Sequence, residues 1–122
     1  MSKTNNFTTE AEEKTINDAF ADVLNGYLRS NHRKKVEIIE RAFRFAKEAH
    51  KGIRRRSGEP YILHPIAVAK IASQEIGLGS TSICAALLHD VVEDTDYTVE
   101  DIEQNFGKKI AQLVEGLTKI SG

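Results

Sequence analysis

The stretch that decides the fold reads Ala85-Ala86-Leu87-Leu88-His89-Asp90-Val91-Val92-Glu93-Asp94-Thr95-Asp96. Its alanine, leucine and valine content is typical of a helix that is buried in a core. Residues three and four apart share one face of a helix, so Asp90, Glu93 and Asp94 would lie close together, with His89 beside Glu93. Carboxylates in apolar surroundings are costly without partners. A divalent cation or an opposing basic group would satisfy the cluster, which makes it the first candidate for a functional site.

Apolar residues recur at helical spacing on both sides of this stretch, and no segment convincingly shows the alternation of a strand. The predicted class is therefore all-α. Helix ends follow from caps and breakers: capping pairs at Thr9/Glu12 and Thr98/Asp101, Pro65 at a first helical position, Ser80 as an N-cap, and Gly77 and Gly107 as helix ends. The predicted helices span about 10–29, 36–52, 65–77, 80–94, 98–106 and 108–120.

Composition points to one ordinary globular domain. The chain has 122 residues, 40% hydrophobic and 29% charged, enough for a single packed core. No run of 18 or more apolar residues predicts a membrane span, and residues 1–10 lack the apolar core of a signal peptide. The single cysteine, Cys84, forms no internal disulfide, so we expect a cytoplasmic location. The net charge is −1, but a basic segment (51–56) and an acidic one (90–103) are separated along the chain.

A loop rich in glycine and proline precedes the third predicted helix and carries Arg54-Arg55-Arg56-Ser57. Guanidinium groups bind phosphate bidentately, and the Ser57 hydroxyl adds a hydrogen-bonding group. The loop is a candidate anion site, although a plain basic surface loop fits the composition equally well. Nucleic-acid binding is less favoured, because no aromatic residues interleave with the arginines.

His64 follows this loop at the entrance of a helix, where folding could bring it beside His89 and Asp90. Imidazole and carboxylate ligands without thiolate suit Mn²⁺, Fe²⁺ or Zn²⁺. The alternatives remain open at this point: His64 as a helix cap, His89 as a hydrogen-bonded core histidine, and the acidic pair as a solvated helix end. Acidic groups at a helix C-terminus oppose its dipole, which favours a site. His32 and His50 have no such setting, and we interpret them as surface or structural residues.

Several motifs together make the chain recognisable. They are His50-Lys51-Gly52, the run from Arg55 to Pro65, the run from Ala85 to Thr95, Phe106-Gly107 and Leu117-Thr118-Lys119. From about Val36 onward the chain resembles the N-terminal hydrolase domain of the RelA/SpoT homologue family, the enzymes of bacterial guanosine tetra- and pentaphosphate metabolism. Residues 1–35, an N-terminal helix and a break, contribute little to the resemblance, and 36–122 form the family-like core.

The resemblance implies an HD-type, all-helical, Mn²⁺-dependent pyrophosphohydrolase that removes the 3′-pyrophosphate from these nucleotides. It implies three sets of residues, matched by position: metal ligands His64, His89 and Asp90; an acidic pair that orients or activates water, Glu93 and Asp94; and nucleotide contacts Arg55, Arg56 and Ser57. Two departures are mild: Ile53 stands where the family often has Gln, and Arg56 where Lys is usual.

The family's fourth metal ligand, an Asp on a later helix, would fall beyond Gly122. We therefore expect the chain to be the N-terminal part of a longer bifunctional enzyme, followed by synthetase and regulatory domains, and to be a poor catalyst in isolation. One alternative is another HD phosphohydrolase acting on deoxynucleotides or cyclic nucleotides, which the 55–64 loop argues against. The other is a non-catalytic regulatory or dimerisation module. No membrane or direct nucleic-acid partner is expected, and a homodimer is an open possibility.

Overall fold

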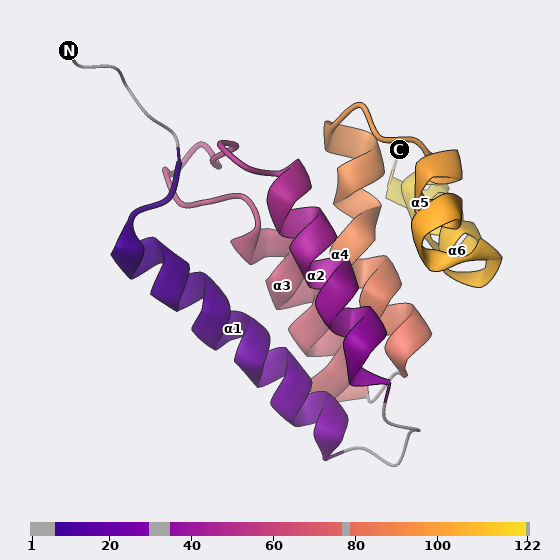
Figure 1. Ribbon diagram of the computed structural model, residues 1–122, viewed down its shortest axis with the longest axis horizontal. Coiled ribbons are helices and arrows are strands. Elements are labelled where there is room, and N and C mark those ends of the chain that lie inside the picture. Colours follow the sequence, from indigo (N-terminus) through magenta and orange to yellow (C-terminus); the bar gives the residue numbers. More distant parts are fainter. Residues whose placement is uncertain (1–6, 30–34, 77–78, 122) are drawn as a thin grey trace.

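The computed structural model describes residues 7–29, 35–76 and 79–121 (Figure 1). Within these ranges the chain is helical and contains no strand, only an isolated bridge between Arg54 and Pro60. This confirms the predicted all-α class. In chain order the elements are α1 (Glu10–Leu28), α2 (Val36–Ala49), α3 (Leu63–Lys70), the π-helical turn η1 (Ile71–Ile76), α4 (Ser80–Asp94), α5 (Val99–Phe106) and α6 (Lys108–Ser121).

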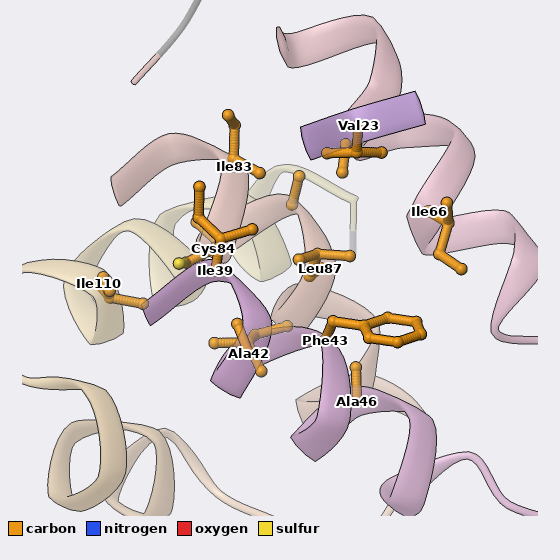
Figure 2. Close-up of a cluster of buried hydrophobic side chains, with 14 of the residues drawn as sticks. Val23, Ile39, Ala42, Phe43, Ala46, Ile66, Ile83, Cys84, Leu87 and Ile110 are labelled. Carbon is orange, nitrogen blue, oxygen red and sulfur yellow. The ribbon is translucent and has the colours of Figure 1, made fainter. Parts of the chain in front are cut away.

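Helix α4 is the centre of the molecule and packs against α2, α3 and α6. Its residues from Ile83 to Leu88 are all buried, as is Val91, so the predicted burial of this helix is confirmed. Figure 2 shows Ile83, Cys84 and Leu87 of α4 among apolar side chains from other helices. Burial raises the pKa of the Cys84 thiol to about 12, which keeps it protonated as a packing residue.

Helix α1 packs against α3 and η1, while α5 and α6 pack against each other at the opposite edge (Figure 1). A buried glycine of α1 allows the close contact between α1 and η1. A Cβ placed on Gly26 would lie 2.4 Å from Cγ of Gln74, which is closer than two carbons can approach. In the described part of the chain, none of the helices is long and apolar enough to span a bilayer.

The helix ends agree with most of the predicted signals. Both capping boxes form, and Gly107 ends α5 with a φ of 96°, a value that favours glycine. Three boundary predictions are wrong, and the first is the end of α2, which lies at Ala49 and not near residue 52. Helix α3 begins at Leu63, so Pro65 is its third residue, where the missing N–H costs nothing because first-turn amides lack intrahelical partners. Gly79 with extended backbone, not Ser80, is the N-cap of α4, and the predicted end at Gly77 lies outside the described residues.

Candidate functional site

The predicted metal ligands meet where the first turn of α3 faces the second half of α4. His64 comes from α3, and His89 and Asp90 come from α4. His64 Nε2 lies 3.7 Å from Oδ2 of Asp90, and His89 Nε2 lies 3.1 Å from its Oδ1. The fold thus brings together three side chains that the sequence separates, and it centres them on one carboxylate.

The donor atoms of this cluster, two imidazole nitrogens and a carboxylate, are of the kinds that bind divalent cations. Asp90 is only 6% exposed, and its Oδ2 is buried without a hydrogen-bond partner, an arrangement that invites an electropositive ligand. His89 Nδ1 lies 3.0 Å from the Ala86 carbonyl oxygen, so a proton on Nδ1 leaves Nε2 as the ligating nitrogen. The imidazoles face different oxygens of Asp90, and the described residues contain no group of three ligands already spaced to hold an ion. Ligation by these three residues therefore stays a prediction.

The same contacts shift the protonation of the cluster. The hydrogen bond with Asp90 raises the pKa of His89 above its usual value, and the Asp90 and Glu93 charges add to this effect. Burial alone would raise the pKa of Asp90, but the hydrogen bond from His89 and the neighbouring His64 outweigh it, and the pKa is lowered. Asp90 is thus held as a carboxylate near neutral pH, as a metal ligand must be.

The predicted acidic pair lies one turn beyond, at the C-terminal end of α4. Glu93 and Asp94 are both exposed. Asp94 Oδ2 lies 3.9 Å from Nε2 of His50, and Glu93 is near enough to His89 to affect its pKa. The two carboxylates therefore flank the cluster without belonging to its centre, and their roles toward water remain predictions.

His50 is the site residue that sequence reasoning missed. It caps the C-terminal end of α2 and is 2% exposed, so it is not a surface residue. Its Nδ1 lies 3.1 Å from the Ala46 carbonyl oxygen, while its Nε2 is buried without a hydrogen-bond partner and faces Asp94. The helical spacing could have predicted the burial of His50, because it lies four residues after Ala46 and continues the buried stripe of α2. His32 lies outside the described residues.

Tyr61 connects His50 to His64. Its ring stacks on His50 with centroids 4.9 Å apart and meets His64 edge-on at 5.8 Å. Burial, with the nearby Asp90 and Asp94 carboxylates, raises the pKa of the Tyr61 phenol well above its usual value. Tyr61 therefore remains a hydrogen-bond donor beside these carboxylates.

The predicted nucleotide contacts sit apart from the cluster, in a tight turn. Arg55, Arg56 and Ser57 are exposed. The turn is closed by Arg55 N–H donating to the Glu59 carbonyl (2.9 Å) and Gly58 N–H donating to the Arg55 carbonyl (2.8 Å). The Ser57 hydroxyl donates to the Glu59 carboxylate. The turn is followed in the chain by Tyr61 and His64, so only a short stretch of sequence separates it from the cluster.

Comparison with known proteins places these features in a family. The sequence model of the HD domain family matches residues 42–122. The chain is 52% identical over 94 residues to a guanosine-3′,5′-bis(diphosphate) 3′-pyrophosphohydrolase of Aquifex aeolicus, which covers 76% of this chain and 13% of that protein. It is 50% identical over 86 residues to the bifunctional (p)ppGpp synthase/hydrolase SpoT of Escherichia coli, covering 70% and 12%. It is 41% identical over 110 residues to a probable GTP pyrophosphokinase of Mycobacterium leprae, covering 90% and 14%.

The chain thus spans only about an eighth of the length of these curated relatives. The family match covers most of its own length, from the middle of α2 through α6. That stretch contains every residue of the candidate site. The names of the three relatives are those of enzymes that make or hydrolyse (p)ppGpp. This chain therefore belongs to the HD domain family, as the HD domain of a RelA/SpoT homologue.

Proposed function

We propose that this chain forms part of a Mn²⁺-dependent 3′-pyrophosphohydrolase of guanosine tetra- and pentaphosphate. One observation supports it above all others: two imidazoles from different helices converge on the buried Asp90 carboxylate, whose Oδ2 has no hydrogen-bond partner. The relatives named above supply the substrate class. One relative is named as both a synthase and a hydrolase, and in this proposal synthetase and regulatory domains would complete the whole protein.

The proposed ligands of Mn²⁺ are His64, His89 and Asp90. When bound, such an ion supplies a water whose pKa falls from about 16 toward 7 to 9. The chain's own contribution is to hold the two imidazole nitrogens against one carboxylate, with the Ala86 carbonyl fixing the His89 ring. Asp90 stays ionised at neutral pH because its pKa is lowered, so the ligand set is ready without a protonation change at the carboxylate.

Glu93 and Asp94 would receive and orient the attacking water. Both are exposed at the rim of the cluster, where solvent and substrate have access. A carboxylate at this position can accept the proton that the water loses as it attacks phosphorus. His50 Nε2 lies 3.9 Å from Asp94 Oδ2, and the Tyr61 side chain interacts with the same carboxylate, so both rings would limit the rotation of Asp94. Hydrolysis then breaks the bond between the 3′ oxygen and phosphorus, and that oxygen takes up a proton.

The exposed Arg55, Arg56 and Ser57 would bind the nucleotide next to the cluster. Guanidinium groups pair with phosphate oxygens through two parallel hydrogen bonds and stack on bases. The turn leads along the chain into Tyr61 and His64, which supports a role for these groups beside the reaction centre. A nucleotide with anionic groups at both its 5′ and 3′ ends could then span the turn and the cluster.

The test uses the natural polypeptide that contains this chain. We expect it to release GDP and pyrophosphate from guanosine tetraphosphate in the presence of Mn²⁺, and expect Asp90→Asn to abolish the release. Cleavage of deoxynucleotides or cyclic nucleotides with no action on guanosine tetraphosphate would replace this proposal by the other HD phosphohydrolase function. The 122-residue chain alone should show weak Mn²⁺ binding and little turnover.

A second candidate is a non-catalytic interaction module, favoured by an apolar surface next to the cluster. A groove of about 330 Å³ lies between α3, α4 and α6 and is bordered by His89, Leu113 and Leu117. The two leucines are 40% and 38% exposed and lie one helical turn apart, so they add an apolar edge to the groove. Light scattering separates the two candidates if the chain dimerises while Asp90→Asn leaves every activity of the whole protein unchanged.

A further inference from the structure

One guanidinium group joins helix α1 to the turn that carries the proposed nucleotide contacts. Arg54 donates from Nη1 to Oε2 of Glu12 (2.9 Å) and from Nη2 to Oε1 of Glu12 (2.7 Å). It also donates to the Gly58 carbonyl (2.7 Å) and to the Phe7 carbonyl (3.1 Å). A single side chain thus holds the tip of the turn, the start of α1 and the segment before α1.

A second set of contacts lies along the same seam. Lys51 Nζ lies 5.1 Å from the centre of the Phe7 ring, within the range of a cation–π contact. A Cβ on Gly52, whose φ is +83°, would be 3.5 Å from the same ring. The residues that precede α1 therefore lie against both the first residues of the turn and its arginine. In Figure 1 the beginning of α1 lies beside the loop between α2 and α3.

We propose that the Glu12–Arg54 pair is a positioning device, which fixes the 52–60 turn so that Arg55, Arg56 and Ser57 present a preformed surface to an anionic nucleotide. The proposal rests on the proposed function, since it takes the nucleotide as the ligand of that surface. Glu12 and Arg54 touch no reacting atom and act only through the turn.

Charge gives the first reason for this role. Three consecutive arginines repel one another, and a turn that bears them loses order unless one charge is compensated. Glu12 neutralises Arg54, Glu59 offsets part of the Arg55 charge, and the exposed Arg55 and Arg56 guanidinium groups would face the ligand. Arg54 points back to α1, whereas Arg55 and Arg56 are exposed. The sequence run of three arginines is thus divided by the fold into one structural and two ligand-facing residues.

Geometry gives the second reason. Isolated exposed ion pairs are worth little, but a bidentate pair with two further carbonyl acceptors restricts the guanidinium in several directions at once. The Gly58 carbonyl is one of these acceptors, and the Gly58 amide donates to Arg55, so the fixed guanidinium is coupled to the backbone of the turn. A turn that is ordered before binding loses less entropy when the ligand arrives.

One partner of the pair, Glu12, lies outside the family match. Helix α1 ends at Leu28, whereas the HD family match begins at residue 42. The part of the chain that contributes least to the family resemblance is therefore the part that holds the nucleotide turn. Its charge partner, Arg54, lies within the matched part.

The experiment separates this role from the other role of Glu12. Glu12 Oε1 also accepts from the Thr9 amide in the capping box, and glutamine serves that box as well as glutamate does. Glu12→Gln therefore keeps the helix cap and removes the charge that Arg54 faces. Arg54→Gln removes the other partner. Thr9→Ala removes the cap alone, and Lys14→Ala removes an unrelated ion pair with Asp18 on the same helix.

Two readouts on the natural polypeptide that contains this chain test the role. In Glu12→Gln and Arg54→Gln we expect KM for guanosine tetraphosphate to rise about five- to tenfold with kcat within about twofold, since ordering of the turn affects binding more than chemistry. Hydrogen exchange at the Arg55 and Gly58 amides should accelerate in both variants. Thr9→Ala and Lys14→Ala should change neither readout.

Unchanged KM in both variants overturns the positioning role, whether or not the turn amides exchange faster, because the pair would then serve the fold alone. An equal fall of kcat in the variants and in Lys14→Ala also overturns it, as a general loss of stability. A wild-type polypeptide that does not act on guanosine tetraphosphate is a different result, and it counts against the proposed function itself.

Discussion

His64 Nε2 lies 3.7 Å from Oδ2 of Asp90, and that oxygen is buried with no hydrogen-bond partner. The distance is too long for a hydrogen bond and leaves the electrostatic demand of the oxygen unmet. A buried carboxylate oxygen in this condition gains more from a cation than from any neutral neighbour.

Replacing Asp90 by asparagine should weaken Mn²⁺ binding to the chain. The change removes the carboxylate on which both imidazoles converge, so the loss should be at least the roughly 10- to 100-fold that removal of an outer-shell partner costs. Isothermal titration with Mn²⁺ measures the effect. Asp18→Asn, which removes an exposed carboxylate of α1, is the matched control and should leave the affinity unchanged. Equal affinities for the wild-type and Asp90→Asn chains would remove these residues from the ligand set.

Two of the site histidines, His50 and His89, should titrate on opposite sides of the ordinary value of 6.5 in the metal-free chain. Burial lowers the pKa of His50, whereas the hydrogen bond to Asp90 raises that of His89. His50 therefore contributes stability above pH 6.5 that is lost as the pH falls through its folded pKa. His89 contributes below pH 6.5, and that contribution is lost as the pH rises through its folded pKa. NMR titration of the imidazole carbons resolves both, and the reverse order would contradict the geometry described here.

The Glu12–Arg54 pair should give an acid-sensitive part of the stability. The side-chain hydrogen bond from Arg54 holds the pKa of Glu12 at about 2, below its ordinary value of 4.5. A lowered carboxyl pKa stabilises the fold fully above pH 4.5, and this contribution disappears as the pH falls toward 2. Urea unfolding of the wild-type chain and of Glu12→Gln should therefore differ most at neutral pH and converge across this window. A difference that stays constant with pH would show that ionisation of Glu12 does not matter.

Two helical glycines should respond to alanine in opposite directions. At Gly26 the new Cβ meets Gln74 Cγ at 2.4 Å and Ser73 Oγ at 3.2 Å, so the overlap exceeds the gain in helix propensity, and a loss of about 1–3 kcal/mol is expected. At Gly116, in α6, the new Cβ meets nothing within 4 Å, and a gain of about 0.5–1 kcal/mol is expected. Thermal unfolding of both variants tests the α1–η1 packing, with Gly116→Ala as the matched control.

The sequence predicted the parts of this molecule that depend on local rules. Capping boxes at Thr9 and Thr98, the break at Gly107 and the burial of α4 follow from short-range patterns, and all are confirmed. The start of α3 was placed two residues late because proline is tolerated throughout a first turn, not only at its first position. The proximity of His64 to Asp90 was expected, although their roles as ligands stay predictions.

Tertiary placement was harder to foresee. The sequence predicts a surface or structural role for His50, because its local setting is unlike that of His64 or His89, yet it is buried between Ala46, Tyr61 and Asp94. The pairing of Arg54 with Glu12 joins residues far apart in the chain, and no periodicity connects them. Such pairs depend on where helices cross, which short-range patterns do not specify.

The seam between α1 and the turn has a consequence for protein engineering. An HD domain cut at the edge of its family match would keep Arg54 and lose Glu12 and the Phe7 carbonyl, so the guanidinium would lose three of its four described hydrogen bonds. A turn transplanted alone into another scaffold would lose the same three hydrogen bonds of Arg54. The portable unit therefore begins at Phe7, well upstream of the HD family match, and domain swaps among relatives should move the two pieces together.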